Sequence, residues 1–334
     1  MSASTMTVAE VEALIAGALV RSKTSEENAG AVTRALVAAE LAGQTGHGLR
    51  RVAAYCAQAR AGKVDGHASP RAETPRPGAL AIDAANGFAY PALELAVDRL
   101  PEMARHNGIA MAGIRRSHHC GVAGVTVEAL ADAGVVALMF ANAPAAMAPW
   151  GGKRALFGTD PIAFAAPMTG AEPVVVDVSL SRVARGKIMA ANQKGEAIPE
   201  GWAFDAAGNP TTDAGAALAG TMAPLGDAKG TALALMVELL AAGLTGANYA
   251  TEASSFFDAE GPPPGVGQLL IAIDPAAFGG PGALQRFADL CMAVQETEGA
   301  RLPGRRRQGM RERMRRDGIA VDPELAGQIA RIGL

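Results

Sequence analysis

Apolar residues in the first sixty positions recur at the three- and four-residue spacing of amphipathic helices. Thr7 and Glu10 form a capping box at the start of the first helix, and Thr24 with Glu27 repeats that box before the second. A third stretch runs from about Gly48 to a stop at Gly62. The apolar positions of the first helix are Val8, Val11, Leu14, Ile15, Ala18 and Leu19. The sequence therefore predicts an N-terminal unit made of helices.

The pattern changes after a proline-rich stretch at residues 68–78, which predicts a linker or a long loop. Short apolar runs bounded by turn residues follow, as is typical of strands; they are LAID, GIAMAGI, VVALMFAN, PIAFAAP, PVVVDVSL and QLLIAID. Helical patterns cover residues 91–106, 122–133 and 229–244, and the last is apolar nearly all round, which predicts a buried helix. From Gly282 onward the chain returns to helix, and we expect this tail to pack on the N-terminal unit.

These alternations predict an α/β or α+β core of at least six strands joined to a helical domain. Neither G-x-G-x-x-G nor G-x-x-x-x-G-K-[ST] occurs, so the two commonest nucleotide-binding loops are missing from the sequence. A dinucleotide, if one binds, must be held by other means.

Composition and charge narrow the class. The chain has 334 residues, 49% of them hydrophobic, and a net charge of -3, which favours a globular enzyme with small partners over a nucleic-acid-binding protein. The basic run at 301–316 is either a solvated helix face or an anion site. Three separated cysteines and an N-terminus without the features of a signal peptide or membrane span lead us to expect a cytoplasmic protein.

The first candidate site is GHGLRR at residues 46–51. On a helix, His47 and Arg51 would lie on one face with their Cβ atoms about 5 to 6 Å apart. A proton donor and a guanidinium fork suited to a carboxylate would then share one site. In the alternative interpretation, His47 caps the helix and Arg51 is a surface residue.

The second candidate site is RSHHCGVAG at residues 116–124. His118 and His119 would diverge in a strand and no third ligand lies nearby, so we expect no metal. Cys120 lacks an evident base, and a small apolar residue in a strand-to-helix turn is its commoner role. The loop begins the helix at 122–133, and the free N–H groups of a helix start suit a phosphate.

Two further residues lie at ends of predicted elements. Asp177 follows an apolar run and is either a capping residue or a ribose ligand. Lys229 precedes the apolar helix at 229–244, and a cation at the positive end of a helix is unfavourable unless an anion is present. This position therefore favours a role for Lys229 in binding an anion.

These motifs together resemble the malate/L-lactate dehydrogenase family of oxidoreductases without a Rossmann fold, over nearly the full length. The resemblance is closest to the Δ1-pyrroline-2-carboxylate/Δ1-piperideine-2-carboxylate reductases. It rests on GHGLRR, RSHHCGVAG, APWGG, FGTDPIAFAAP, VVVDVSLSRVARGK, IPEGWAFDAAGNPTTD, PLGDAKGTALALMVELLAAGLTG and RLPG, which occur in the family's order. It implies a homodimer with a mostly antiparallel mixed sheet that binds a nicotinamide cofactor. The implied domains are a helical domain (1–75 with 284–334), a small α/β domain (76–125) and an NAD(P)-binding domain (126–283).

The resemblance also implies roles for particular residues. His47 matches the family's proton donor, Arg51 its ligand for the substrate carboxylate, and Thr159 a second substrate contact. The implied cofactor contacts are His119, Cys120, Gly121, Val122, Ala123, Asp177, Val178, Ser179, Arg185, Gly186, Lys229, Gly304 and Arg305. The loop at 116–124 is thus expected to frame a dinucleotide, with no metal and no thiol chemistry.

Two positions depart from the family pattern. The family's usual Ser before the proton-donor His is Gly46 here, and the Asp of some imine reductases is Lys187, so a Ser-His-Asp relay is not implied. Lys187 is a catalytic candidate that would orient a carboxylate, stabilise an oxyanion or contact the cofactor.

The resemblance favours an NAD(P)H-dependent reductase of a cyclic imine carboxylate, forming L-proline or L-pipecolate and thus serving proline metabolism. The arginines at 305–307 favour NADP(H), with NAD(H) also possible. One alternative is an NAD(P)-dependent 2-hydroxyacid dehydrogenase of the malate, lactate, sulfolactate or ureidoglycolate type. An alternative of another class is a non-catalytic dinucleotide-binding sensor.

Overall fold

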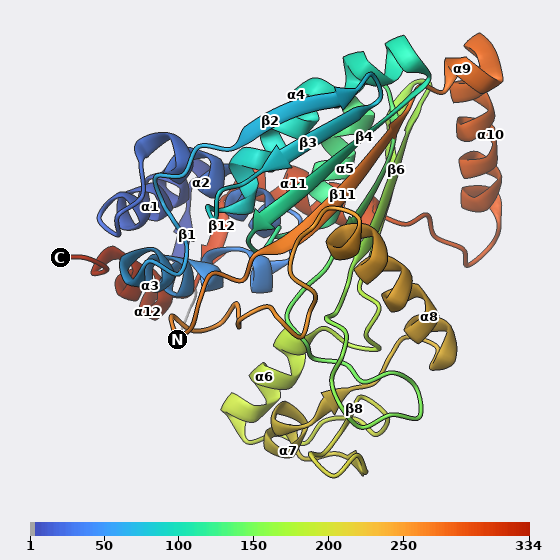
Figure 1. Ribbon diagram of the computed structural model, residues 1–334. Helices are drawn as coiled ribbons and strands as arrows, with labels where there is room; N and C mark the ends of the chain where they lie inside the picture. Colours follow the sequence, from blue (N-terminus) through green and yellow to red (C-terminus); the bar gives the residue numbers. More distant parts are fainter. Residues whose placement is uncertain (1–3) are drawn as a thin grey trace.

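The computed structural model describes residues 4–334, and a twisted seven-stranded sheet forms its centre (Figure 1). The strands lie in the order β2-β3-β4-β11-β5-β6-β7, and every neighbouring pair is antiparallel except β3 with β4. Their bounds are β2 Arg71–Arg76, β3 Ala79–Asp83, β4 Ile109–Ser117, β5 Val136–Ala141, β6 Ile162–Met168, β7 Ala171–Val178 and β11 Val266–Ile273. The predicted mixed, mostly antiparallel sheet is confirmed, and all six predicted strands belong to it.

The linker expected at residues 68–78 is wrong, because most of it forms β2. This strand pairs only with β3 and lies at the edge of the sheet. Most of its side chains are exposed, so it carries no apolar pattern. Pro75 is tolerated there because an edge strand has one side with no ladder to complete.

Helices α4 (Ala89–Asn107) and α5 (Ala123–Asp132) lie beside each other on one face of the sheet. Helix α4 contacts β3, β4 and β11, while α5 contacts β5, β6 and β7. Leu270 and Ala272 of β11 belong to the core that these helices share. Helix α4 also supplies the crossover that the parallel pair β3 and β4 requires.

The opposite face is covered by α8 (Ala228–Val237), which continues into a π-helical segment at Glu238–Gly243. Leu269 of β11 packs there with Ala234, Val237 and Ala241. The expectation of a buried helix is wrong for this chain alone, because only one side of the helix meets the sheet. Its exposed apolar side chains are Leu233, Leu235, Met236, Leu239 and, just beyond, Leu244.

Both ends of the chain build the helical unit, which holds α1 (Val8–Val20), α2 (Glu26–Leu41), α3 (Val52–Ala61), α11 (Arg305–Asp317) and α12 (Pro323–Ala330). Strand β1 (Ser4–Met6) pairs antiparallel with β12 (Ile319–Val321). The capping box of Thr7 and Glu10 is confirmed. Helix α2, however, has Ser25 as its N-cap in place of Thr24, because the Ser25 hydroxyl accepts from Asn28 N–H.

The C-terminal tail divides in two. Helices α11 and α12 pack on α2 and α1, as expected of the tail. Helix α10 (Ala283–Glu296) does not, because it contacts β6 and lies at the far side of the sheet (Figure 1). The short elements α9 (Ala276–Gly279) and a 3₁₀ turn at Gly280–Gly282 precede it.

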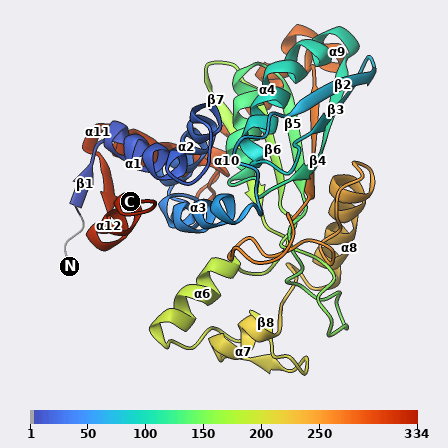
Figure 2. The ribbon, with the colours of Figure 1, turned by 60° about the vertical axis from the view of Figure 1, so that its left-hand side comes forward.

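A small unit formed by residues 185–222 lies below the main sheet in the view of Figure 2. It contains α6 (Arg185–Lys194), α7 (Ala214–Ala219) and the strands β8 (Ala203–Phe204), β9 (Pro210–Thr211) and β10 (Thr221–Met222). These elements enclose a separate apolar cluster around Ile188 and Ile198. The main sheet continues across the expected boundary at 125/126, since β4 and β5 both pair with β11; the three-domain division stays a prediction.

No helix within residues 4–334 is both long enough and apolar enough to cross a bilayer.

Candidate active site

His47 lies in the first of two short 3₁₀ turns, Thr45–His47 and Leu49–Arg51, that precede α3. Gly48 separates them with φ -105° and ψ -130°, and a Cβ there would lie 2.2 Å from Glu40 Oε1. That Glu40 oxygen accepts from Leu49 N–H at 2.7 Å. The expected single helix carrying His47 and Arg51 on one face is therefore wrong, because the backbone turns at Gly48. The two side chains remain close enough for the Arg51 charge to act on the His47 ring.

Four side chains from four segments form a hydrogen-bonded chain. His47 Nδ1 lies 3.2 Å from His119 Nε2, and the two rings stack 7° from parallel. His119 Nδ1 lies 2.5 Å from the hydroxyl of Tyr55, which lies 2.9 Å from the hydroxyl of Tyr90. His47 is partly exposed, whereas the other three side chains are buried. The structure thus brings the two candidate motifs into direct contact.

Burial keeps the four hydrogen-bonded side chains uncharged at neutral pH. It lowers the pKa of His47 to about 4, with the nearby Arg51 charge as the second cause, and lowers that of His119 well below its usual range for the same two leading reasons. Burial also raises the pKa of Tyr55 to about 12 and that of Tyr90 well above its usual range. At neutral pH each imidazole carries one proton and each phenol keeps its own.

His118 lies beside the chain in an aromatic enclosure of Tyr55, Phe88 and Phe256, with ring centroids 5.4 to 5.8 Å away. Neither of its ring nitrogens has a hydrogen-bond partner within residues 4–334. Burial, followed by the charges of Arg51 and Lys63, lowers its pKa to about 3. His118 therefore behaves as an aromatic packing residue.

Arg51 is held on two sides. Its Nε donates to the carbonyl of Gly46 at 3.0 Å, and its guanidinium lies over the ring of Phe257, 4.5 Å from the centroid. Its Nη1 is buried without an acceptor in the described part of the chain. A buried guanidinium nitrogen without a partner suits an anionic ligand such as a carboxylate.

A second group of predicted residues meets at the start of α5. The Asp177 carboxylate, at the end of β7, accepts from Gly124 N–H at 3.0 Å and lies 4.0 Å from Arg307 Nη2. Asp177 of β7 therefore caps the N-terminus of α5. Its contact with a ribose stays a prediction. A Cβ on Gly124 would lie 2.3 Å from Arg307 Nη1, an atom that is buried and has no partner among residues 4–334.

The other predicted cofactor contacts of the 116–124 loop and of the basic run at 301–316 lie near the start of α5. Cys120 is buried, and burial raises the pKa of its thiol to about 12, which opposes a thiolate nucleophile. Gly121, with φ +69°, lies against Tyr90, while Val122 is the N-cap and Ala123 the first residue of α5. Gly304 packs on β7 and precedes the exposed Arg305 in the first turn of α11.

The other predicted residues lie on loops toward the small unit. Thr159 O accepts from Leu180 N–H at 2.8 Å, and Leu180 O accepts from Leu225 N–H at 2.7 Å. Val178 and Ser179 lead into this segment at the end of β7. Arg185, Gly186 and Lys187 form the first turn of α6, and Lys229 lies exposed in the first turn of α8. No hydrogen bond joins any of these residues to His47 in the described part of the chain.

Four aromatic residues of the site were not singled out from the sequence, and they are Tyr55, Tyr90, Phe256 and Phe257. Two features of the sequence could have pointed to Tyr55. The chain has only 3 tyrosines, and Tyr55 follows Arg51 by about one helical turn.

A buried carboxyl pair lies behind Thr159. Asp160 is fully buried with φ +38°, and its Oδ1 accepts from Ala143 N–H at 3.3 Å. Glu238 accepts from Ala250 N–H at 3.1 Å and from the Asn142 side chain. Burial and the neighbouring Glu238 raise the pKa of Asp160 well above its usual range, and burial raises that of Glu238 to about 7.

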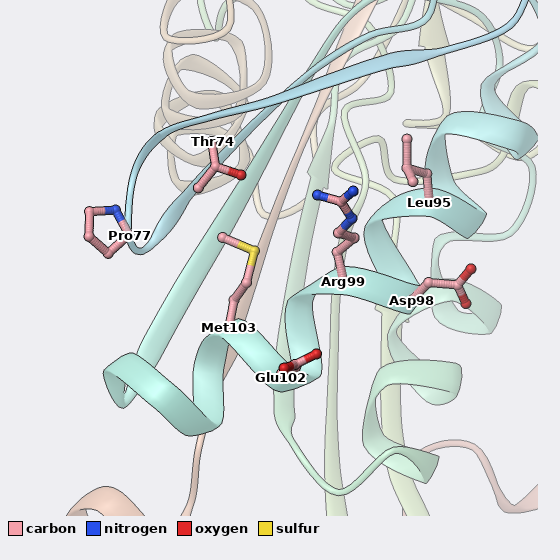
Figure 3. A pocket seen from close by; sticks show the side chains of 7 residues that line it. All are labelled: Thr74, Pro77, Leu95, Asp98, Arg99, Glu102 and Met103. Atoms are coloured by element: carbon pink, nitrogen blue, oxygen red, sulfur yellow. The ribbon is translucent and has the colours of Figure 1, made fainter.

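A cavity of about 510 Å³ lies elsewhere, between the β2–β3 hairpin and α4 (Figure 3). It is lined by Thr74, Pro77, Leu95, Asp98, Arg99, Glu102 and Met103, and it contains none of the predicted site residues. Within residues 4–334, no three His, Cys, Asp or Glu side chains are grouped as metal ligands would be.

Comparison with known proteins places this site in context. The model of a family described as malate/L-lactate dehydrogenase matches residues 6–330. A protein of Chromohalobacter salexigens named (2R)-3-sulfolactate dehydrogenase (NADP(+)) is 52% identical over 302 residues, 90% of each chain. A Pseudomonas aeruginosa protein named Δ1-pyrroline-2-carboxylate/Δ1-piperideine-2-carboxylate reductase is 42% identical over 323 residues, 96% of each chain.

Solved structures agree with the fold. The crystal structure of Δ1-piperideine-2-carboxylate reductase from Pseudomonas syringae superposes with a TM-score of 0.93 at 37% identity, over 98% of this chain and 99% of that one. Sulfolactate dehydrogenase from Methanocaldococcus jannaschii superposes with a TM-score of 0.89 at 30% identity, over 98% and 96% of the two chains.

Proposed function

The chain belongs to the malate/L-lactate dehydrogenase family and is an NAD(P)-dependent oxidoreductase, and on that premise we propose that it interconverts a short 2-hydroxyacid and its 2-oxoacid with NADP(H). The substrate in this proposal carries a second anionic group, as 3-sulfolactate does. The observation that carries the proposal is the 52% identity to a (2R)-3-sulfolactate dehydrogenase, against 39% and 42% for two imine reductases.

Two cations without an ion-pair partner among residues 4–334, Arg51 and Lys187, support this substrate class. Arg51 has a buried nitrogen free for a carboxylate. Lys187, at the position where some imine reductases have Asp, is exposed and forms no ion pair with any residue of 4–334. A substrate with two anionic groups would use two such cations, whereas a cyclic imine carboxylate has a single anionic group.

In this proposal His47 and Arg51 divide the work. Arg51 holds the carboxylate in a fixed orientation, which lowers the entropic part of the barrier. His47 is neutral at neutral pH; its Nε2–H donates a hydrogen bond to the substrate oxygen and stabilises the negative charge that develops there during reduction, while water supplies the proton that completes the hydroxyl. Removing one such donor commonly costs about 10² to 10³ in rate.

The residues around α5 fit a nicotinamide dinucleotide. The missing Cβ at Gly124 makes room for the Arg307 guanidinium, whose buried Nη1 has no partner among residues 4–334 and, beside the helix start, suits a phosphate. Arg305 and Arg306 are exposed cations on the same turn and would favour the additional phosphate of NADP(H). When bound, the cofactor supplies or accepts the hydride.

A cyclic imine carboxylate, the first expectation from the sequence, remains the second candidate substrate. It is supported by several Δ1-pyrroline-2-carboxylate reductases at 36–42% identity and by the TM-score of 0.93 to a Δ1-piperideine-2-carboxylate reductase. The same His47 Nε2–H would then donate a hydrogen bond to the ring nitrogen.

We also propose a cytoplasmic homodimer that uses the exposed apolar side of α8. A row of large apolar side chains on one helix is unusual at the surface of a monomer. Leu235 and Leu239 are 50% and 54% exposed, which is more than a single soluble chain is expected to leave in contact with water.

The test follows NADPH and NADH oxidation with 3-sulfopyruvate, oxaloacetate, pyruvate and the two cyclic imines. The proposal expects fastest turnover with 3-sulfopyruvate and NADPH. Turnover confined to the imines would replace it with the second candidate, and tighter binding of NADH would contradict the cofactor preference. His47→Ala separates catalysis from binding, because it should abolish turnover and spare NADPH binding measured by fluorescence.

A further inference from the structure

The hydrogen-bonded chain that begins at His47 ends inside the protein. It passes from His47 to His119, then to the Tyr55 hydroxyl and finally to the Tyr90 hydroxyl. Tyr55 is fully buried, and Tyr90 is 4% exposed. Beyond Tyr90 the chain stops, since Tyr55 is the only hydrogen-bond partner of the Tyr90 hydroxyl within residues 4–334.

Because all four groups are neutral, each contributes one proton to the chain. Only two arrangements then give every hydrogen bond one donor and one acceptor and also use the Tyr55 proton; a third, in which both His119 and Tyr90 donate to Tyr55, leaves the buried Tyr55 proton without an acceptor. In the outward arrangement Tyr90 donates to Tyr55, Tyr55 to His119 and His119 to His47, so that His47 carries its proton on Nε2. In the inward arrangement every donation is reversed, and His47 carries its proton on Nδ1.

The closed end at Tyr90 decides between the two. In the inward arrangement the Tyr90 proton has no acceptor, and a buried donor without an acceptor is costly. In the outward arrangement every proton of the buried groups is used, and only acceptor capacity is left unfilled. Gly121 lies against this hydroxyl so closely that a Cβ there would lie 2.8 Å from the oxygen.

We propose that Tyr55 is a positioning residue, which through His119 holds His47 in the tautomer that carries its proton on Nε2, away from the chain. The inference rests on the proposed function, in which that N–H donates to the substrate oxygen. His118 offers an internal contrast, because it is buried next door and neither of its nitrogens has a partner to fix a tautomer.

The decisive variants are Tyr55→Phe and Tyr90→Phe. Each removes one hydroxyl and leaves a ring in the aromatic cluster around Phe88. Tyr55→Phe cuts the chain at His119. Tyr90→Phe is the matched control, because Tyr55 still has His119 as its only acceptor and the outward arrangement survives. Thermal unfolding of both variants checks that the fold is kept.

The kinetic expectation separates the two variants. Tyr55→Phe should lower kcat by about 10- to 100-fold, as loss of an orienting partner commonly does, with KM nearly unchanged. Tyr90→Phe should keep kcat near the wild-type value. An unchanged kcat in Tyr55→Phe overturns the proposal, as does an equal loss in both variants, because a relay to the end of the chain would then be at work.

A second readout does not depend on turnover. The protein has 5 histidines, so ¹⁵N-histidine labelling with His47→Gln for assignment resolves the His47 ring nitrogens by NMR. The proposal expects the Nε2–H tautomer in the wild type and in Tyr90→Phe, and a mixture in Tyr55→Phe. An Nδ1–H tautomer in the wild type overturns it. If no substrate turns over, the proposed function fails while these spectra still decide the tautomer.

Discussion

The guanidinium of Arg51 lies over the ring of Phe257, 4.5 Å from its centroid, while one of its nitrogens is buried with no acceptor among residues 4–334. The aromatic face holds the planar cation without using its hydrogen-bonding edge. The hydrogen-bonding edge of the guanidinium is thereby left for a ligand.

Replacing Arg51 with Lys keeps the charge and loses the planar fork. Loss of a charge-assisted hydrogen bond of about 1.5 to 3 kcal/mol corresponds to a fall in kcat/KM of about 10- to 150-fold. Steady-state kinetics should show this mainly as a higher KM for the 2-oxoacid. The exposed neighbour supplies the control, Arg50→Lys, and an equal loss there would refute a specific role of Arg51.

His118 should make the protein sensitive to acid. Its pKa in the folded protein is about 3, below the ordinary 6.5, because it is buried. As pH falls below 6.5 the unfolded chain takes up a proton that the folded chain does not, so stability present above pH 6.5 is lost toward pH 3. His118→Phe should recover about 2 kcal/mol relative to the wild type at pH 5.

Thermal unfolding at pH 7.5 and pH 5 measures this difference. At pH 7.5 the variant should match the wild type, because neither His118 nitrogen has a partner to lose. The exposed His67→Gln serves for comparison. A variant as acid-sensitive as the wild type would show that His118 is not responsible.

Asp160 should act in the opposite direction. Its folded-state pKa lies well above the usual value, chiefly through burial, so the folded chain keeps a proton that the unfolded chain releases above about pH 4. Stability is therefore lost as pH rises. Asp160→Asn removes this loss and keeps an oxygen for Ala143 N–H, so its melting temperature should exceed that of the wild type increasingly from pH 5 to pH 8.

The exposed Asp98→Asn variant provides the baseline for that series. A constant difference between Asp160→Asn and the wild type across the pH range would contradict a buried proton at this position. Glu238 adds to the loss of stability with rising pH up to neutral pH, because its pKa is raised to about 7.

The apolar side of α8 should hold two chains together. Leu235→Asp places a charge in the middle of this side and should convert a dimer to a monomer in sedimentation velocity at micromolar concentration. Leu334→Asp, at another exposed leucine, should leave the dimer intact. A wild-type protein that sediments as a monomer would refute the homodimer directly.

The sequence was informative where local pattern decides structure. Six strands followed from apolar runs bounded by turn residues, and Gly62 ends α3 in the left-handed conformation that favours glycine. The edge strand β2 escaped because its exposed, proline-containing sequence resembles a loop. The burial of α8 was misjudged because an apolar pattern reveals that a surface avoids water, without revealing what covers it.

The site was only half visible for a similar reason. His47 and His119 both stood out in the sequence, but their contact joins positions 72 residues apart. Tyr55 and Tyr90 come from different helices and meet only after α4 packs on its sheet. The turn at Gly48 depends on Glu40, a buried carboxylate of α2, and no spacing rule anticipates that contact.

The pairing of Ser4 with Val321 has a consequence for how the protein is made. On the ribosome, the sheet strands through β11 are complete while β12, α11 and α12 are still unsynthesised. A contact between residues so far apart in the sequence forms late, because closing the long loop between them costs entropy before the contact can stabilise the fold. The helical unit that bears His47 is thus completed only once α11, β12 and α12 have been synthesised, and nascent chains arrested after β11 should be protease-resistant in the sheet and sensitive in α1.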